Sequence, residues 1–305
     1  MVAVVAILAT GAACDGGWDD GTAGAGRSFI PSYTEVPYRG LGTWVDVFDF
    51  SARFARDGEP TVTPDDVGRM AEQGIRTIYL QAGRDDEAVP GGIVDPDVVG
   101  EFLTRAHERG MAVVAWYLPE AYDFDDLLRV RALRDFEADG HRFDGIALDI
   151  EARSAVPDVA ERNRRLVEFS RAVRSQIGDA ALGAIVLPTV LLEVVNPDFW
   201  PDFPWRELAP VYDVWLPMAY WTDRTWASGY RDAGRYVDET IRRMTANLGR
   251  SATIHAIGGI GDGAEVGDYE GFARAARQHG AVGLSVYDYD TTPPHHWSAL
   301  REAAP

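Results

Sequence analysis

The sequence has no lysine, a single cysteine and no excess of positive charge. Its 29 basic residues are therefore all arginine, and 48 acidic residues bring the net charge to -19. Such a surface repels phosphate, which argues against nucleic acid as a partner. One cysteine cannot form a disulfide within the chain, so the folded state must depend on its hydrophobic core. Hydrophobic residues make up 46% of the 305 residues, which is enough for a large core.

Long apolar runs are also scarce, and the one at residues 1–13 is too short to cross a bilayer as a helix. Small residues and Cys14 follow it, an order that resembles a bacterial lipoprotein signal in which Cys14 becomes lipidated. Gly11 stands where leucine is usual and no basic residue precedes the run, so a plain secretory signal is the alternative. We expect a signal peptide at 1–14 and an extracellular or cell-surface protein, with membrane contact only through a lipid on Cys14.

The segment 15–28 is rich in glycine and aspartate and has no periodicity, which is typical of a flexible tether. We expect the rest of the chain, 29–305, to form one domain and the protein to be a monomer. Eight apolar runs of this domain have the length and composition of strands: 43–50, 75–81, 111–118, 143–150, 181–187, 211–220, 251–257 and 281–289.

Segments typical of helices separate several of these runs. The segment 63–74 begins with Thr63 and Pro64 and ends at a glycine, and the segments 95–110, 156–178 and 268–280 also end at glycine. Strands that alternate with helices form parallel sheets with right-handed crossovers. The count of eight, the chain length and the lack of a Gly-rich phosphate loop after the first strand favour an α/β fold of the (β/α)8 (TIM) barrel type. An open doubly wound sheet is the alternative.

Two acids end the fourth strand, in the stretch "RFDGIALDIEARS" (142–154). Side chains alternate along a strand, so Asp149 and Glu151 share a face with the small residues Gly145 and Ala147. The opposite face is mostly apolar and suits packing against helices. In a (β/α)8 barrel the reacting groups lie at the carboxyl ends of the strands, so we expect both acids at the barrel mouth.

Other strand ends carry aromatic and acidic side chains as well. Rings stack on the apolar faces of sugars, and acids bind hydroxyl groups, so this combination predicts a carbohydrate site. Glycoside cleavage needs a protonated carboxyl group that donates to the leaving oxygen. We assign that role to Glu151, with Asp149 orienting it or stabilising positive charge. The expected substrate contacts are Asp46, Gln81, Trp116, Met218, Trp221, Tyr287 and Asp288.

The stretch "DGIALDIE" resembles the fourth-strand motif DGxDxDxE of glycoside hydrolase family 18, the chitinase family, and "PMAY" resembles its sixth-strand Met-x-Tyr. The resemblance implies an acid role for Glu151. It also implies that Asp149 and Tyr220 contact an N-acetyl group whose oxygen acts as nucleophile. The chain departs from the family at three places: Ala147 replaces the first inward Asp, Trp221 replaces the Asp after Tyr, and "WYLP" replaces Ser-x-Gly-Gly.

These departures leave alternatives open. Another sugar could be cleaved with Asp288 or Glu120 as the second carboxylate, or the barrel could bind carbohydrate without cleaving it. A metal-dependent hydrolase is a further rival. We expect no metal and no cofactor, because His295 and His296 have no clustered third ligand and His255 is typical of a core histidine. The sequence therefore predicts an exported glycoside hydrolase that acts on an extracellular or cell-envelope polysaccharide.

Overall fold

The computed structural model describes residues 33–305. The predicted signal peptide, the lipidation site Cys14, the predicted tether and residues 29–32 lie outside the described residues. Within 33–305, no helix combines the length and the apolar character that a membrane span requires.

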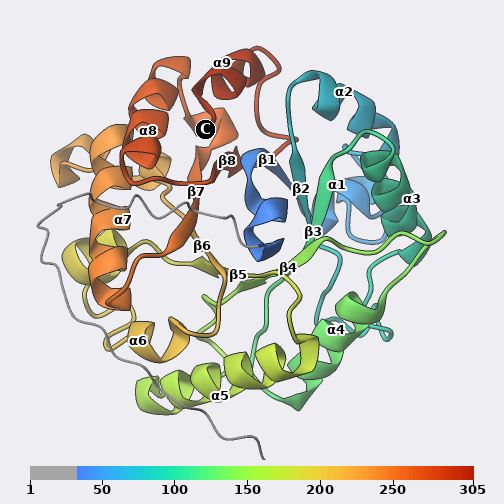
Figure 1. The fold of residues 1–305 in the computed structure, drawn as a ribbon, viewed down its shortest axis with the longest axis horizontal. Helices are drawn as coiled ribbons and strands as arrows, with labels where there is room; N and C mark the ends of the chain where they lie inside the picture. The colour runs from blue at the N-terminus through green and yellow to red at the C-terminus, as the bar shows by residue number, and fades with distance from the viewer. Residues whose placement is uncertain (1–32) are drawn as a thin grey trace, which may run out of the picture. The chain divides into compact units, whose positions relative to one another are not determined.

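Eight parallel strands close into a barrel in chain order, so the predicted (β/α)8 fold is confirmed (Figure 1). The strands are β1 (Gly40–Val45), β2 (Thr77–Leu80), β3 (Ala112–Tyr117), β4 (Gly145–Asp149), β5 (Leu182–Val186), β6 (Val214–Pro217), β7 (Thr253–Ile260) and β8 (Gly283–Tyr287).

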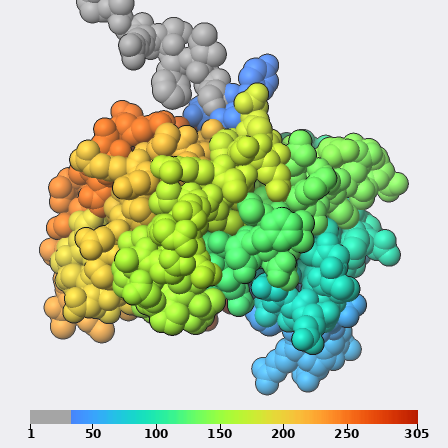
Figure 2. All heavy atoms as spheres, turned by 90° about the horizontal axis from the view of Figure 1, so that it is seen from below, coloured from blue at the N-terminus to red at the C-terminus, as the bar shows by residue number. Residues whose placement is uncertain are grey.

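Helices surround the barrel, and α4 and α5 lie side by side on the flank seen in Figure 2. The α-helices of the described chain are α1 (Val47–Phe50), α2 (Val67–Glu72), α3 (Pro96–His107), α4 (Phe124–Asp135), α5 (Val159–Ile177), α6 (Trp205–Leu208), α7 (Ala233–Leu248), α8 (Val266–Gln278) and α9 (His296–Ala303).

The helix boundaries follow the local signals of the sequence. Asp123 caps α4 by accepting hydrogen bonds from the N–H groups of Asp125 and Asp126, and Asp158 caps α5 in a similar way. Such caps satisfy N–H groups that have no partner inside the helix. The glycines that end the predicted segments 63–74, 95–110, 156–178 and 268–280 all adopt positive φ angles, which residues with a side chain rarely do.

The predicted first strand, 43–50, is wrong in its second half. The chain leaves β1 after Val45 and enters α1, because Asp46 accepts the Phe48 N–H while the Asp49 carboxylate accepts the Asp46 N–H. This reciprocal pair is a capping box, which favours a helix start over continued strand. The predicted sixth strand, 211–220, is also shorter, since the chain bends after Pro217.

The amino-terminal end of the barrel is closed by a 3-10 helix, Tyr33–Tyr38. The Tyr38 hydroxyl enters the barrel and donates to the Ile146 carbonyl oxygen at 2.8 Å. His255 lies in the same buried layer, with Nδ1 2.8 Å from the Tyr38 carbonyl oxygen and Nε2 3.0 Å from Ser285 Oγ. Burial lowers the pKa of His255 to about 4, so it is a neutral core histidine, as expected.

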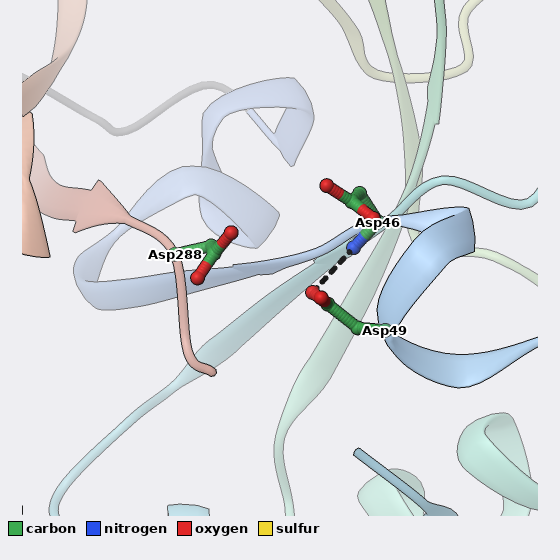
Figure 3. Close-up of side chains that lie close together, drawn as sticks. All are labelled: Asp46, Asp49 and Asp288. Atoms are coloured by element: carbon green, nitrogen blue, oxygen red, sulfur yellow. Dashed lines mark hydrogen bonds between the residues drawn. The ribbon is translucent and has the colours of Figure 1, made fainter. Parts of the chain in front are cut away.

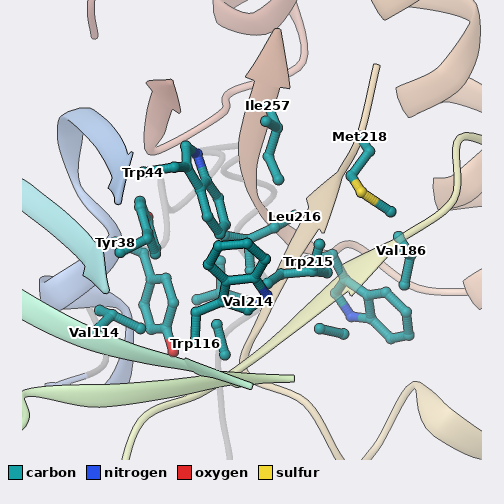
Figure 4. Close-up of a cluster of buried hydrophobic side chains, with 14 of the residues drawn as sticks. Tyr38, Trp44, Val114, Trp116, Val186, Val214, Trp215, Leu216, Met218 and Ile257 are labelled. Atoms are coloured by element: carbon teal, nitrogen blue, oxygen red, sulfur yellow. The ribbon is translucent and has the colours of Figure 1, made fainter. Parts of the chain in front are cut away.

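The core above this layer is aromatic (Figure 4). Trp44 stacks on Tyr79 at a ring separation of 4.3 Å, and Trp116 meets Trp44 edge-on at 5.4 Å. Edge-on and offset stacked pairs are the favourable geometries for aromatic rings. These rings fill the barrel interior beneath the mouth, so any ligand must bind above them, at the carboxyl ends of the strands.

We expect Gly183→Ala to destabilise the barrel, because a Cβ there would lie 2.7 Å from Leu216 Cδ1 and 2.9 Å from the Tyr38 ring. Overpacking of this kind costs about 1–3 kcal/mol. Thermal unfolding followed by circular dichroism should show a lower Tm for this variant. Gly267→Ala is the control, since no atom lies within 4 Å of its Cβ position in α8. Equal Tm values for the two variants would contradict the packing argument.

Candidate active site

The acid pair lies where β4 reaches the barrel mouth. A Cβ on Gly145 would lie 3.1 Å from the Tyr38 hydroxyl, which is inside the barrel. Gly145, Ala147 and Asp149 alternate along β4 and therefore point inward. Asp149, at the end of this series, is 5% exposed. Glu151 lies two residues beyond β4 and is partly exposed. The arrangement places one buried and one accessible carboxyl group beside each other.

Both carboxyl groups hold protons more tightly than ordinary acids. Burial raises the pKa of Asp149 well above its usual value, and the charge of Glu151 raises it further. Burial also raises the pKa of Glu151, against the opposing effect of Arg153. A carboxyl group that stays protonated near neutral pH can act as a general acid.

The two arginines nearest to the acid pair in the sequence, Arg142 and Arg153, form no ion pair with it within residues 33–305. Arg142 pairs with Glu137. Arg153 donates to the Phe199 carbonyl oxygen at 3.0 Å and lies over the Phe199 ring at 3.6 Å. Within residues 33–305, Glu151 forms no ion pair with any arginine or histidine. The carboxyl group of Glu151 is therefore available to a ligand.

Aromatic side chains line the space beside the pair. The Tyr220 and Tyr287 rings are 6.2 Å apart, and Trp116 meets Tyr287 edge-on at 6.0 Å. Burial, together with the charges of Asp149 and Glu151, raises the pKa of Tyr220 well above its usual value, so its hydroxyl stays a hydrogen-bond donor. These rings come from β3, β6 and β8 or the residues directly after them.

A second acidic group, Asp46, Asp49 and Asp288, lies where β1 and β8 end (Figure 3). Carboxylate oxygens of the three residues lie within 4.8 Å of one another, close enough to hold a cation. Tyr287 donates to Asp46 at 2.7 Å, and Thr291 donates to Asp288 at 2.9 Å. Burial, then the charges of Asp46 and Asp288, raises the pKa of Asp49 to about 8.

Sequence reasoning did not select Asp49 or Tyr122 for the site. The spacing of Asp46 and Asp49, which fits a capping box, was a usable signal for Asp49. Tyr122 lies in the connection between β3 and α4. Burial and then the charge of Asp149 raise the pKa of Tyr122, so it lies near the acid pair, while its hydroxyl donates to the Ala152 carbonyl oxygen at 3.1 Å. No local pattern marks that residue.

Three of the expected substrate contacts have other surroundings. Gln81 accepts the Val47 N–H at 3.1 Å and so holds α1 in place. Met218 is buried in the core. Trp221 is fully buried, packs on Phe272 at 5.3 Å and donates to Asp268 at 3.1 Å. The expectation that Trp221 lines the mouth is therefore corrected, because its ring lies against α8.

Glu120, considered above as a second carboxylate, has an exposed side chain in the connection after β3. The Asp126 carboxylate accepts its backbone N–H at 3.3 Å. Burial, and then the neighbouring acids Asp46 and Asp290, raises the pKa of Asp288. Of the mouth residues expected from the sequence, the structure brings Asp149, Glu151, Trp116 and Tyr220 together, and Tyr287 connects them to Asp46.

A groove of about 990 Å³ opens on the outer wall, between α5, the segment 200–207 and the end of α7. Its rings, Trp200, Phe203 and Trp205, are each at least nine-tenths buried, so they present little face to a ligand. Carboxyl groups with raised pKa values, among them Asp49, Asp149 and Glu151, lie at the mouth instead. We therefore assign the candidate active site to the mouth.

The chain matches no protein-family model, and no curated protein matches it significantly by sequence. Solved structures with the same fold include the glycoside hydrolase domain of PgaB (BpsB) from Bordetella bronchiseptica. That match has a TM-score of 0.57 and 14% identity and covers 87% of this chain and 98% of the other.

A class V chitinase from Pseudomonas fluorescens Pf-5 matches with a TM-score of 0.61 and 8% identity, over 87% of this chain and 99% of the other. An endo-β-1,4-mannanase from Thermotoga petrophila matches with a TM-score of 0.61 and 12% identity, over 89% and 77%. The chain thus has the (β/α)8 barrel fold of glycoside hydrolases, including class V chitinases. At these identities the similarity concerns the fold alone.

Proposed function

We propose that this protein is a glycoside hydrolase that cleaves an extracellular or cell-envelope polysaccharide at the barrel mouth. The observation that carries the proposal is the Asp149–Glu151 pair: two neighbouring acids with raised pKa values, of which Glu151 is partly exposed and forms no ion pair with an arginine. The fold shared with glycoside hydrolases supports the same reaction class.

Glu151 donates its proton to the glycosidic oxygen, and the bond between that oxygen and the anomeric carbon breaks. Positive charge then develops on the sugar ring, next to the carboxylate of Asp149. The partly exposed Tyr220 and Tyr287 supply ring faces and hydroxyl groups for the sugar. After the leaving group departs, water attacks the anomeric carbon and its proton returns to Glu151.

The surroundings of the acid pair favour assistance by the substrate. Within residues 33–305, Glu151 is the carboxyl group whose charge raises the pKa of Asp149, and Glu120 is exposed. Asp288 interacts with Asp46 and Asp290 instead. A sugar with an N-acetyl group can provide its own nucleophile, the acetamido oxygen, where no second carboxylate is in reach.

A panel of chitin, peptidoglycan and plant or bacterial glycans, assayed for new reducing ends, tests the activity. Release from an N-acetylated glycan supports the proposed reaction. Binding of a glycan by both the native protein and Glu151→Gln, without release by either, would instead identify a carbohydrate-binding barrel. The replacement of the family's first Asp by Ala147 is the feature that favours this second function.

We expect the activity to survive a chelator, because the proposed proton transfer needs no metal. The group Asp46, Asp49 and Asp288 makes a metal-dependent hydrolase the competing reaction class. Treatment with EDTA followed by dialysis should change kcat less than about twofold. A loss of tenfold or more that zinc restores would contradict carboxylic acid catalysis without metal.

The proposed location is the cell exterior or surface, with a lipid on Cys14 as the anchor. Cell fractionation with radiolabelled fatty acid tests both parts. Label on the native chain and its loss in Cys14→Ser support the anchor. An unlabelled protein released into the medium supports plain secretion, and retention of both forms in the cytoplasm contradicts export.

A further inference from the structure

Two buried polar atoms at the mouth have no hydrogen-bond partner within residues 33–305: Trp116 Nε1 and Asp149 Oδ1. Both residues are more than nine-tenths buried. An unpartnered buried donor or acceptor destabilises the folded state, so such atoms are uncommon in folded proteins. Nine buried side-chain atoms in residues 33–305 have no partner, and these two are a donor and an acceptor on the neighbouring strands β3 and β4 at the mouth.

The two atoms come from adjacent strands. The register of β3 and β4 places Trp116 beside Ala147, and Asp149 is the next inward position along β4. The Trp116 N–H lowers the pKa of the Asp149 carboxyl group, although the two atoms do not form a hydrogen bond in the described chain. An indole nitrogen can only donate, so it favours the ionised form of Asp149.

The other groups around the pair do not supply a hydrogen bond that stabilises the ionised form of Asp149. Glu151 disfavours the charge on Asp149, and the Tyr122 hydroxyl donates to the Ala152 carbonyl oxygen. Tyr220 interacts with both acids, and Arg153 acts on Glu151. Among the described side chains, Trp116 is therefore the one whose hydrogen-bond donor stabilises the ionised form of Asp149. This effect opposes that of burial.

We infer that Trp116 is a positioning residue: its indole N–H closes a hydrogen bond to Asp149 when that carboxyl group is ionised, and thereby keeps the proton of the pair on Glu151. The consequence for catalysis rests on the proposed function, whereas the hydrogen bond is a property of the free protein. In this arrangement Glu151 is the protonated member of the pair, and Asp149 is the anion beside the developing positive charge.

The first test is a pH titration of the full chain by ¹H–¹⁵N NMR of the tryptophan indole groups. Trp116→Phe identifies the Trp116 signal by its loss. That signal should move as the acid pair ionises, and the movement should be absent in Asp149→Asn. The inference is overturned if the chemical shift of the Trp116 indole does not change with pH, or if it changes equally in Asp149→Asn. This result does not depend on whether the protein cleaves a glycan.

The second test uses the glycan cleaved by the native protein. Trp116→Phe keeps a ring but removes the N–H, so kcat should fall about 10- to 100-fold with little change in KM, as expected for loss of a hydrogen bond to a charged group. The acidic limb of the pH–rate profile should move to higher pH, because Asp149 then ionises less readily. An unmoved acidic limb overturns the inference.

Trp44→Phe is the matched control. Trp44 belongs to the same aromatic cluster, with its ring 5.4 Å from that of Trp116, but its N–H donates to Ser285 at 2.9 Å. Its substitution should leave the acidic limb in place even if stability falls. If the Trp116 signal follows Asp149 but no glycan is cleaved, the hydrogen bond is supported and the proposed function alone fails.

Discussion

Glu151→Gln should reduce glycan cleavage by at least about 10²- to 10⁴-fold, the range that general acid catalysis contributes. Glutamine has nearly the same shape but carries no transferable proton at this position. Because burial raises the pKa of Glu151, its replacement by glutamine should not lower stability near neutral pH. Initial rates of reducing-end release, together with Tm, measure both effects.

Glu120→Gln is the control for this experiment. Glu120 is an exposed acid after β3, and its replacement makes the same Glu-to-Gln change near the mouth. Its kcat should stay within about twofold of the native value. If Glu120→Gln were as inactive as Glu151→Gln, or if Glu151→Gln kept native activity, the assignment of the general acid would be wrong.

Asp49→Asn should stabilise the protein increasingly as pH rises from about 4 to 8. The pKa of Asp49 is raised to about 8 in the folded chain, against 3.8 as its ordinary value. Across that window the native protein retains a proton that the unfolded chain has released, so native stability is lost as pH rises. Asparagine has no proton to lose and still offers an oxygen to the Asp46 N–H.

The expected gain at pH 8 is on the order of 2–5 kcal/mol, since each pKa unit corresponds to about 1.4 kcal/mol. Urea unfolding of the native protein and of Asp49→Asn at several pH values gives the difference in their unfolding free energies as a function of pH. The control Asp179→Asn alters an exposed acid and should give a flat difference. A flat curve for Asp49→Asn would show that Asp49 ionises normally.

The barrel itself could be predicted from the sequence because its signals are local. Apolar runs, helix-capping residues and closing glycines repeat along the chain, and each can be identified without knowledge of distant residues. The positions of Asp149 and Glu151 were predictable for the same reason: alternation along β4 decides which side chains face inward. These features depend on neighbours within a few residues.

Prediction was weaker beyond the ends of the strands. The position of Trp221 just after the sixth strand predicted that it lines the mouth, but the chain bends after Pro217 and a 3-10 helix places the ring against Phe272. The capping box at Asp46 likewise ended β1 earlier than its apolar character suggested. Past the last residue of a strand, the direction of a side chain depends on the turn, which alternation does not describe.

The sequence by itself determined the eight-fold alternation of strands and helices and the acid pair at the end of β4, because short-range periodicity carries both. Only the tertiary structure decided which side chains meet across strands. Closure of the barrel brings β8 beside β1, so that Asp288 joins Asp46 and Asp49, and the β3–β4 register places Trp116 beside Ala147, one inward position before Asp149. Those contacts join residues from separate strands. Strand register and barrel closure fix the distances between these residues, and no local pattern of the sequence encodes either of them.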